Sequence, residues 1–506
     1  MPASSILDSI SKWAHHKIIL QKLNNPFGFV AIILFTGIIG LAIGVMGIKV
    51  GALILGALLA LPVLLMIIAE LQIGLLLMLI IAFLTNLLVK MGDYPVGISL
   101  DALTYFMIFA IFIRQIKERD WDFINNPVSF VIVIWLGYNL MQALNPVAGS
   151  VKAWLYAVRS MAGLIMVYFI ALYSFNNLNR IKWMIKAIIV LTFAAALYGI
   201  KQEFIGFEQF ELDWLYSVEK RALLIVQWGR IRPFSFFSDP TTCGILMVYM
   251  AAFCAVIASG PYKIWKRVLL IVIALCCITT MGYGGSRTPV VLVPIGALFY
   301  VLLTLKKNIV IGGALTLVVF MGFMLKTSSN PIIYRMQSAF RPGNDASVQV
   351  RMDNQKLIQP YIQSHPFGSG LGSTGLWGQR FTPNSWLAHF AHDSGFVRVA
   401  VEMGWIGLIV YMVLLFKIMQ TGIYYYLRVR DPVIKNLYLA INISIFMLLV
   451  ASYPQEIIIL LPNSIIFYIF VAAIVRLKDF DPAFQNLKKG KNKDLIQVEE
   501  DVEISV

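Results

Sequence analysis

Long apolar runs separated by short polar or basic segments cover most of the 506-residue chain. In a helix, about 20 apolar residues cross a bilayer core of about 30 Å. Fourteen runs fit this description, which predicts an all-α integral membrane protein with about fourteen transmembrane helices. The predicted spans are residues 27–47, 50–69, 73–89, 97–113, 127–144, 156–175, 183–204, 241–258, 267–282, 288–305, 309–325, 395–417, 436–452 and 457–475.

Two segments between these spans, residues 205–240 and 326–394, are too long for simple hairpins. The second contains Ser347–Ile362, which is expected to form an amphipathic helix lying on the membrane, with Arg351 off its apolar face. That face is formed at helical spacing by Val350, Asn354, Leu357 and Tyr361.

The ends of the chain differ from the apolar part, which extends over residues 27–475. Residues 1–26 are expected to form a basic amphipathic segment at the cytoplasmic surface. Residues 476–506 carry lysines followed by acidic residues, which predicts a disordered cytoplasmic tail. The first span lacks a short apolar region with a small-residue cleavage site, so it is expected to be a retained helix rather than a signal peptide.

Composition supports the membrane interpretation. Hydrophobic residues make up 59% of the chain, and charged residues make up 13%, whereas soluble domains are about 25% charged. A soluble fold has no place for this much apolar surface, and general disorder or a disulfide-stapled secreted domain is equally excluded. The cysteines lie in or beside apolar runs without metal-ligand spacing; they are Cys243, Cys254, Cys276 and Cys277.

The basic residues predict an orientation. Lysine and arginine concentrate in the cytoplasmic loops of membrane proteins. With the N-terminus inside, the inner segments hold eighteen such residues and the outer loops with their flanking helix ends hold six. Both termini are therefore expected in the cytoplasm, with residues 205–240 and 326–394 outside. The same bias explains the net charge of +15 without a nucleic-acid partner.

Arginines and glycine-rich turns gather in the predicted outer segments. Arg230 and Arg232 precede an aromatic stretch, and Gly282–Arg287 combines three glycines with a terminal arginine. Such glycines permit close backbone approach to a ligand, and arginine forks match phosphate oxygens. With Arg351, they suggest a site for a lipid pyrophosphate at the outer bilayer face. Nearby aromatic residues are expected to form an interfacial belt or to stack on sugars: Trp214, Trp228, Phe234, Trp377 and Trp386.

Gly370, Gly372 and Gly375 match the spacing GxGxxG, but no parallel-sheet strand precedes them, which argues against a dinucleotide site. A flexible loop and a backbone lid over a substrate are the two remaining interpretations. Further on, His389 and His392 precede the twelfth span, and His392 is a candidate general base. An interfacial histidine or a metal ligand are the alternatives, although no third ligand is evident.

Charges inside the predicted spans also require a reason. Arg159 either extends to the outer headgroups or binds an anion. Arg398 and Glu402 stand four residues apart, which favours a structural ion pair.

The order of the outer motifs is similar to that of the O-antigen ligase and O-antigen polymerase superfamily of bacterial polytopic membrane glycosyltransferases. The resemblance covers about residues 180–420. The motifs are Arg232-Pro-Phe-Ser-Phe-Phe-Ser-Asp-Pro, a Gly-Ser-Arg turn ending at Arg287, Arg351 opening an amphipathic helix, Pro-Phe-Gly-Ser-Gly-Leu-Gly, and His392-Asp-Ser-Gly-Phe followed by Glu402-Met-Gly-Trp-Ile-Gly.

This resemblance implies a metal-independent enzyme without a cofactor, in the bacterial inner membrane. It would transfer or polymerise glycan from an undecaprenyl-pyrophosphate-linked donor onto a glycan or lipid-linked acceptor at the outer face. Arg232 and Arg287 would hold the pyrophosphate, assisted by Arg159, Arg230 and Arg351, and His392 would act on the acceptor hydroxyl. Asp393 and the Ser-Asp-Pro sequence stand where many members carry asparagine, which bears on the substrate more than on the reaction. Ligases usually have twelve spans, so fourteen favour a polymerase.

Two other classes stay open from the residues alone. A flippase or polysaccharide transporter is expected to place its polar residues near mid-membrane, often in repeated halves. The candidates here gather at one face, and no repeat of 20–50 residues is found in the sequence. A membrane scaffold has no need of the arginine cluster.

Overall fold

The computed structural model describes residues 61–92, 96–227, 229–326, 346–392 and 394–485, with a few isolated positions elsewhere. In this part of the chain, the secondary structure is helical except for one short strand pair. Strand β1 (Val226–Gln227) pairs antiparallel with β2 (Arg230–Ile231). The predicted all-α class is therefore confirmed for the described residues.

Ten of the described helices are long and apolar enough to cross a membrane, which makes the chain a multi-pass membrane protein. Each coincides with a predicted span. They are α4 (Leu71–Met91), α5 (Val96–Glu118), α6 (Pro127–Met141, extended by a 3-10 turn to Leu144), α7 (Val151–Ser174), α8 (Leu178–Phe204), α11 (Pro240–Ala258), α12 (Ile264–Gly284), α13 (Arg287–Thr304), α19 (Gly395–Arg428) and α20 (Pro432–Ala451).

The other four predicted spans have different outcomes. The eleventh corresponds to α14 (Lys307–Leu325) and the fourteenth to α21 (Asn463–Leu477). Helix α21 has only 15 residues, because a 3-10 turn and Pro462 occupy the start of the predicted span. The first two spans and the segment 1–26 lie outside the described residues, except for helical residues 61–69. A total of fourteen stays a prediction.

Helices α11 and α20 lie at the centre of the bundle. In their most apolar 18-residue stretches, 83% and 72% of the residues are buried. Both helices are apolar on every side, which is the pattern of a helix surrounded by protein. Most of the other long helices bury less than half and expose large apolar side chains such as Phe109, Phe130 and Phe416. That outer surface suits a lipid environment.

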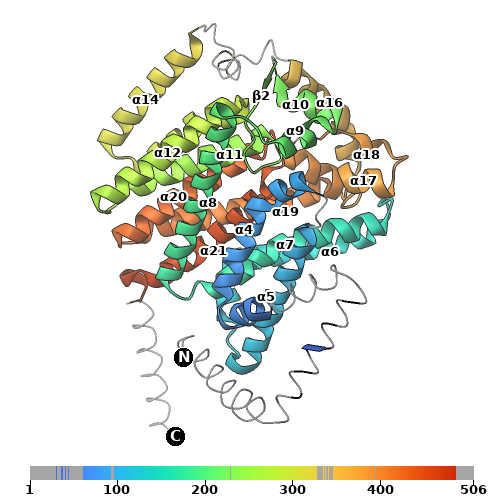
Figure 1. Ribbon diagram of the computed structural model, residues 1–506, viewed down its shortest axis with the longest axis horizontal. Coiled ribbons are helices and arrows are strands. Elements are labelled where there is room, and N and C mark those ends of the chain that lie inside the picture. The colour runs from blue at the N-terminus through green and yellow to red at the C-terminus, as the bar shows by residue number, and fades with distance from the viewer. Residues whose placement is uncertain are drawn as a thin grey trace.

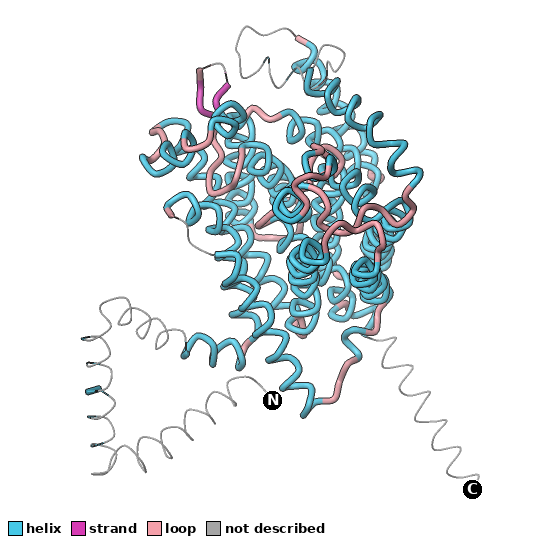
Figure 2. The backbone as a smooth tube through the Cα atoms, turned by 90° about the vertical axis from the view of Figure 1, so that its right-hand side faces the viewer, coloured by secondary structure: helices cyan, strands magenta, loops and turns pink. Residues whose placement is uncertain are grey.

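The short elements gather at one end of the bundle (Figure 1). Figure 2 looks onto this end, where loops and the strand pair lie. The elements come from the two long segments between predicted spans, which places both segments at the same end, although no membrane side is assigned by this. They are α9 (Gln209–Tyr216), α10 (Glu219–Ile225), α16 (Ala346–Ser364), α17 (Gly375–Phe381) and α18 (Trp386–His389).

The expected amphipathic helix at 347–362 is present as α16. Its buried residue Ile358 packs against Leu387 of α18 and Val401 of α19. Val350 and Leu357 are exposed on the other side. The helix is thus fixed to the bundle by one face, while contact of the other face with a membrane stays a prediction.

The predicted disordered tail begins later than residue 476. Helix α21 continues into a 3-10 turn, Lys478–Phe480, and residues up to 485 are described. The Asp481 carboxylate is buried and accepts hydrogen bonds from the backbone N–H groups of Arg430 and Asp431, at 3.0 and 2.8 Å. Residues 486–506 lie outside the described part.

Candidate active site

His392 lies in the segment that leads into α19. The helix begins at Gly395 with Ser394 as its N-cap, so His392 precedes the helix and does not share a helical face with residues 395, 396 and 399. A Cβ at Gly395 would lie 3.3 Å from the Ser452 carbonyl oxygen. The space beside Gly395 is therefore filled by the backbone of the α20–α21 loop.

The close approach of that loop brings Glu456 to His392. The His392 Nδ1 lies 2.5 Å from Glu456 Oε1, and Arg398 Nη1 lies 2.7 Å from Glu456 Oε2. Burial favours the neutral form of the Glu456 carboxyl, but the hydrogen bond from His392 and the charge of Arg398 outweigh it and lower its pKa to about 2. Glu456 is thus ionised and accepts the Nδ1–H of His392.

Arg398 connects this contact to α17. Its Nε lies 3.4 Å from Glu402, which confirms the predicted ion pair four residues apart. The Glu402 carboxylate also accepts a hydrogen bond of 2.5 Å from the Thr374 hydroxyl, just before α17 begins. Glu402 is 2% exposed. The contacts therefore form one continuous network, in the order His392, Glu456, Arg398, Glu402 and Thr374.

The second ring nitrogen of His392 has a different environment. Among the described residues, the buried Nε2 has no hydrogen-bond partner. It lies 3.8 Å from where a Cβ of Gly375 would stand. In the neutral tautomer that donates Nδ1–H to Glu456, Nε2 carries the lone pair. The histidine therefore has the arrangement of a general base with an orienting carboxylate.

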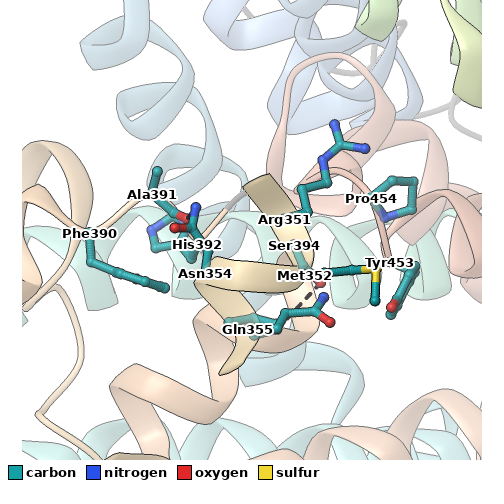
Figure 3. Close-up of a pocket in the computed structure, with 11 residues that line it drawn as sticks. Arg351, Met352, Asn354, Gln355, Phe390, Ala391, His392, Ser394, Tyr453 and Pro454 are labelled. Atoms are coloured by element: carbon teal, nitrogen blue, oxygen red, sulfur yellow. Dashed lines mark hydrogen bonds between the residues drawn. The ribbon is translucent and has the colours of Figure 1, made fainter. Parts of the chain in front are cut away.

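His392 also lines a pocket with about 630 Å³ of empty space. Figure 3 shows its wall, made from α16, the segment 390–394 and the α20–α21 loop. Arg351 contributes the cationic side chain, and Tyr453 and Pro454 contribute apolar surface. Asn354 donates a 3.3 Å hydrogen bond to the Ala391 carbonyl and ties α16 to the histidine segment. Arg351 and His392, which are distant in sequence, thus share one cavity.

Arg287 extends this cationic region. The charges of Arg287 and Arg351 are close enough to repel one another. Arg287 is the first residue of α13 and directly follows Ser286, whose hydroxyl lies 3.3 Å from Arg232 Nη1. The three predicted arginines therefore belong to one region.

Arg232 itself is largely engaged with protein groups. Its Nη2 donates to Leu224 O at 2.5 Å, and its Nη1 lies 3.4 Å from Gly284 O. It thus connects the end of α10 to the α12–α13 turn that carries Arg287. Through these contacts Arg232 supports the turn that carries Arg287, in addition to any direct contact with a ligand.

Lys90 is a residue whose role the sequence interpretation missed. Its position between two predicted spans is typical of a loop charge, yet it is only 6% exposed. Its Nζ donates to Phe237 O at 2.6 Å and lies 3.9 Å from the centre of the Phe234 ring. Lys90 therefore holds the segment 234–237, which follows Arg232, against α4. Phe234 is fully buried and packs with Trp214, so neither is an open sugar platform.

The glycine-rich turns also differ from expectation. Gly282 and Gly284 are helical residues of α12, and a Cβ at Gly284 would lie 3.5 Å from Pro240 O. Gly284 therefore allows α12 to pack on α11, while Gly285 ends the helix with φ 57°. The turn serves helix packing and presents Arg287, rather than offering a glycine backbone to a ligand.

The loop 368–374 packs against α19 and α7, while its role as a flexible loop or as a lid stays a prediction. The N–H groups of Ser369 and Gly370 donate at 2.9 Å to the carbonyls of Val401 and Glu402, where α19 is interrupted at Gly404. A Cβ on Gly372, which has φ 82°, would stand 2.6 Å from Ala153 O. The loop thus fills the kink of α19 and fixes Thr374 beside Glu402.

Two predicted binding residues lie apart from the pocket of His392. Arg230 forms an ion pair with Glu203 and lies 5.6 Å from the Tyr283 ring centre. Arg159 forms an ion pair with Asp101 at 3.3 Å in a separate groove.

His389 is exposed, and its Nε2 lies 2.8 Å from Pro383 O. Trp228 and Asp393 lie outside the described residues.

No group of three or more histidine, cysteine, aspartate or glutamate side chains suited to a metal is found within the described ranges.

Glu456 is the other important residue that sequence reasoning missed. The available signal was an acidic residue between two long apolar runs, at the same predicted face as His392. Its partner is far away in sequence, so only the folded chain identifies the contact.

Residues 272–412 match the family model described as O-antigen ligase. The matched region extends from α12 to the first part of α19. It contains Arg287, Arg351, His392, Arg398 and Glu402, whereas Arg232 and Glu456 lie outside it. No curated protein matches the chain.

Proposed function

We propose that the chain is a glycosyltransferase of the O-antigen ligase and polymerase superfamily and that it uses an undecaprenyl-pyrophosphate-linked glycan as donor. The match of residues 272–412 to the O-antigen ligase family model supports this proposal. It acts at the outer face of the bacterial inner membrane, with both termini in the cytoplasm. It transfers or polymerises the glycan onto a sugar acceptor, and the fourteen predicted spans favour polymerisation. The activated bond is carried by the lipid, so neither a nucleotide sugar nor a metal is required.

The reaction follows from the positions of His392 and the arginines. An acceptor hydroxyl gives its proton to His392 Nε2 and attacks the anomeric carbon of the donor sugar. The new carbon–oxygen bond replaces the bond from that carbon to the pyrophosphate oxygen. The lipid pyrophosphate leaves with the bonding electrons, and Arg287 and Arg351 stabilise its growing negative charge. Glu456 holds the ring of His392 and stabilises the imidazolium that forms.

One observation carries this proposal: a histidine oriented by the partly buried carboxylate of Glu456 shares a pocket with Arg351. A base and an anion site are the two elements that this transfer needs. A transporter or scaffold has no need of an oriented histidine. The side chain of Arg230 is paired with Glu203 and is assigned no direct contact with the donor.

The test is a transfer assay with the full-length protein in nanodiscs, a lipid-pyrophosphate oligosaccharide, an acceptor glycan and a chelator. Product formation without added nucleotide is expected. A positioned general base contributes about 10²–10⁴-fold in rate, so His392→Ala should lose at least about 100-fold. His389→Ala is the matched control and should retain activity, because that histidine lies outside the pocket.

Absence of transfer with the correctly folded wild type would reject the glycosyltransferase proposal. Normal turnover by His392→Ala would leave the reaction but remove the base assignment. Dependence on an added divalent cation would contradict the metal-independent mechanism.

A further inference from the structure

A second pocket, with about 650 Å³ of empty space, lies between α5, α7 and the stretch Ile459–Ile465. Its wall is mainly apolar, with Leu100, Leu164 and Val167 among the lining residues. Along α7 it extends over nine residues, from Arg159 to Val167, which is about 12 Å of helix. The pocket is therefore an elongated groove that runs along the bundle from the Arg159 level.

One end of the groove is charged. Arg159 Nε lies 3.3 Å from Asp101 Oδ2, with 42% and 23% of the two side chains exposed. The guanidinium carbons of Arg159 and Arg380 lie 5.5 and 5.7 Å from the centre of the same Tyr156 ring. Two guanidinium groups therefore lie near one tyrosine. Of the two, only Arg159 forms an ion pair with a carboxylate among the described residues, that of Asp101.

The tyrosine is also part of an aromatic stack. Trp377 and Phe381, both on α17, stack on Tyr156 with ring centres at 4.8 and 5.3 Å. Arginines beside stacked aromatic rings suit a headgroup that combines phosphate and sugar. An apolar groove that begins at this level suits the attached hydrocarbon chain.

Helix α17 joins this cluster to the catalytic histidine. Its first residue, Gly375, lies beside His392 Nε2, and its last turn carries Arg380 and Phe381. The pocket with Arg351 also reaches His392 but is lined by α16 and Tyr453. The base thus has two cationic sites near it, approached along different elements of the fold.

We propose that the α5–α7 groove binds the isoprenoid chain of a lipid-linked acceptor, with its phosphate at Arg159 and Arg380. The assignment to the acceptor rests on the proposed function, in which the donor pyrophosphate lies at Arg287 and Arg351. The acceptor sugar then extends along α17 to His392 Nε2. The groove is a second lipid site, separate from the arginine region of the donor.

Labelling with a photoreactive isoprenoid monophosphate tests the lipid site without any transfer reaction. The full-length protein in nanodiscs should be labelled on peptides of α5, α7 and residues 459–465. Gly97→Trp fills the mouth of the groove and should reduce this labelling at least about tenfold. Gly137→Trp is the matched control, because a Cβ at either glycine meets nothing within 4 Å and Gly137 does not line the groove.

Charge variants separate a ligand site from a structural ion pair. Arg159→Gln should reduce labelling about tenfold, whereas Asp101→Asn should increase it, since the carboxylate no longer competes for the guanidinium. Equal losses in both variants would show that the pair only supports the fold and would overturn the proposal. Unchanged labelling in Gly97→Trp would do the same.

Kinetics then identify the lipid. In Gly97→Trp the KM for a lipid-linked acceptor should rise at least about tenfold, with the KM for the donor within about twofold of the wild type. A rise in the donor KM alone would overturn the acceptor assignment. If the protein shows the labelling pattern but no transfer, the lipid site stands and the proposed function fails, so the two failures are distinguishable.

Discussion

The contact between His392 and Glu456 decides which ring nitrogen of the histidine can accept a proton. Glu456 holds Nδ1–H at 2.5 Å, and its carboxylate is held in turn by Arg398. Among the described hydrogen bonds, none joins His392 or Glu456 to Arg351, which lines the same pocket. Glu456 is therefore a positioning residue, and its removal should affect the tautomer and the charge of His392 rather than donor binding.

Glu456→Gln should lower kcat at least about tenfold with little change in the donor KM, since orienting carboxylates of catalytic triads contribute more than this. The acidic limb of the pH–rate profile should move to lower pH, because the imidazolium loses its carboxylate partner. Steady-state kinetics from pH 5 to 9 measure both effects. Glu456→Asp should restore part of the activity. An unshifted profile would show that Glu456 does not act through His392.

The stability of the same pair provides an independent pH test. The folded-state pKa of Glu456, about 2, lies below its ordinary value of 4.5. Its contribution to stability is therefore present above pH 4.5 and lost as the pH falls towards 2. Thermal unfolding in detergent should show that the wild type loses more stability than Glu456→Gln between pH 5 and 3.

Arg232 and Arg287 should respond differently to replacement by lysine, which keeps the charge but loses the fork. Charge-assisted hydrogen bonds contribute about 1.5–3 kcal/mol, so each variant should lower donor kcat/KM about 10- to 100-fold. Arg232→Lys should also lower the unfolding temperature, because Arg232 connects Leu224 to the turn at Gly284. The same measurement on Arg287→Lys provides the comparison. Full activity in both would reduce them to structural or interfacial residues.

Among the elements, α19 and the loop before α17 support each other. Helix α19 is interrupted at Gly404, and the exposed backbone groups there are satisfied by the loop at residues 366–370. Ile406 N, beyond the interruption, donates to Pro366 O at 3.3 Å. Because Thr374 and Glu402 lie on these two elements, their packing controls the network behind His392.

Gly372→Ala tests this support. Gly372 has φ 82°, and the new methyl group would meet the Ala153 carbonyl on α7. Strained backbone of this kind costs about 1–3 kcal/mol, so the unfolding temperature should fall and activity should fall with it. Gly137→Ala, where a Cβ has open space, should be neutral or stabilising. Equal stability of both variants would show that the loop tolerates displacement.

At the level of the bundle, the short elements at one end and the basic residues at the other predict the orientation. Single cysteines at Glu118, Trp265 and Arg430, in a background without the native cysteines, should be protected from a membrane-impermeant reagent added outside intact cells. A cysteine at Gln359, exposed on α16, should react. Labelling of both sets from outside would contradict the topology and place the His392 pocket on the wrong side for the proposed donor.

The apolar runs alone determined that the chain is a helical membrane protein. Each run has to form its own backbone hydrogen bonds in lipid, so run length predicts helix position almost independently of the rest of the fold. Motif order indicated the family whose model residues 272–412 match. The four-residue spacing was sufficient for the Arg398–Glu402 pair, because that spacing is a local property of the sequence.

Only the tertiary structure decided which residues meet. Glu456 joins His392 because Gly395 lets the α20–α21 loop approach, and Lys90 supports the Arg232 segment from a different helix. Arg159 carries the same charge as Arg351, yet it faces a groove of its own. Helix periodicity states which face a side chain occupies but not which helix lies opposite. Contacts between distant segments depend on packing, so the network behind His392 and the separation of the two cationic sites required the folded chain.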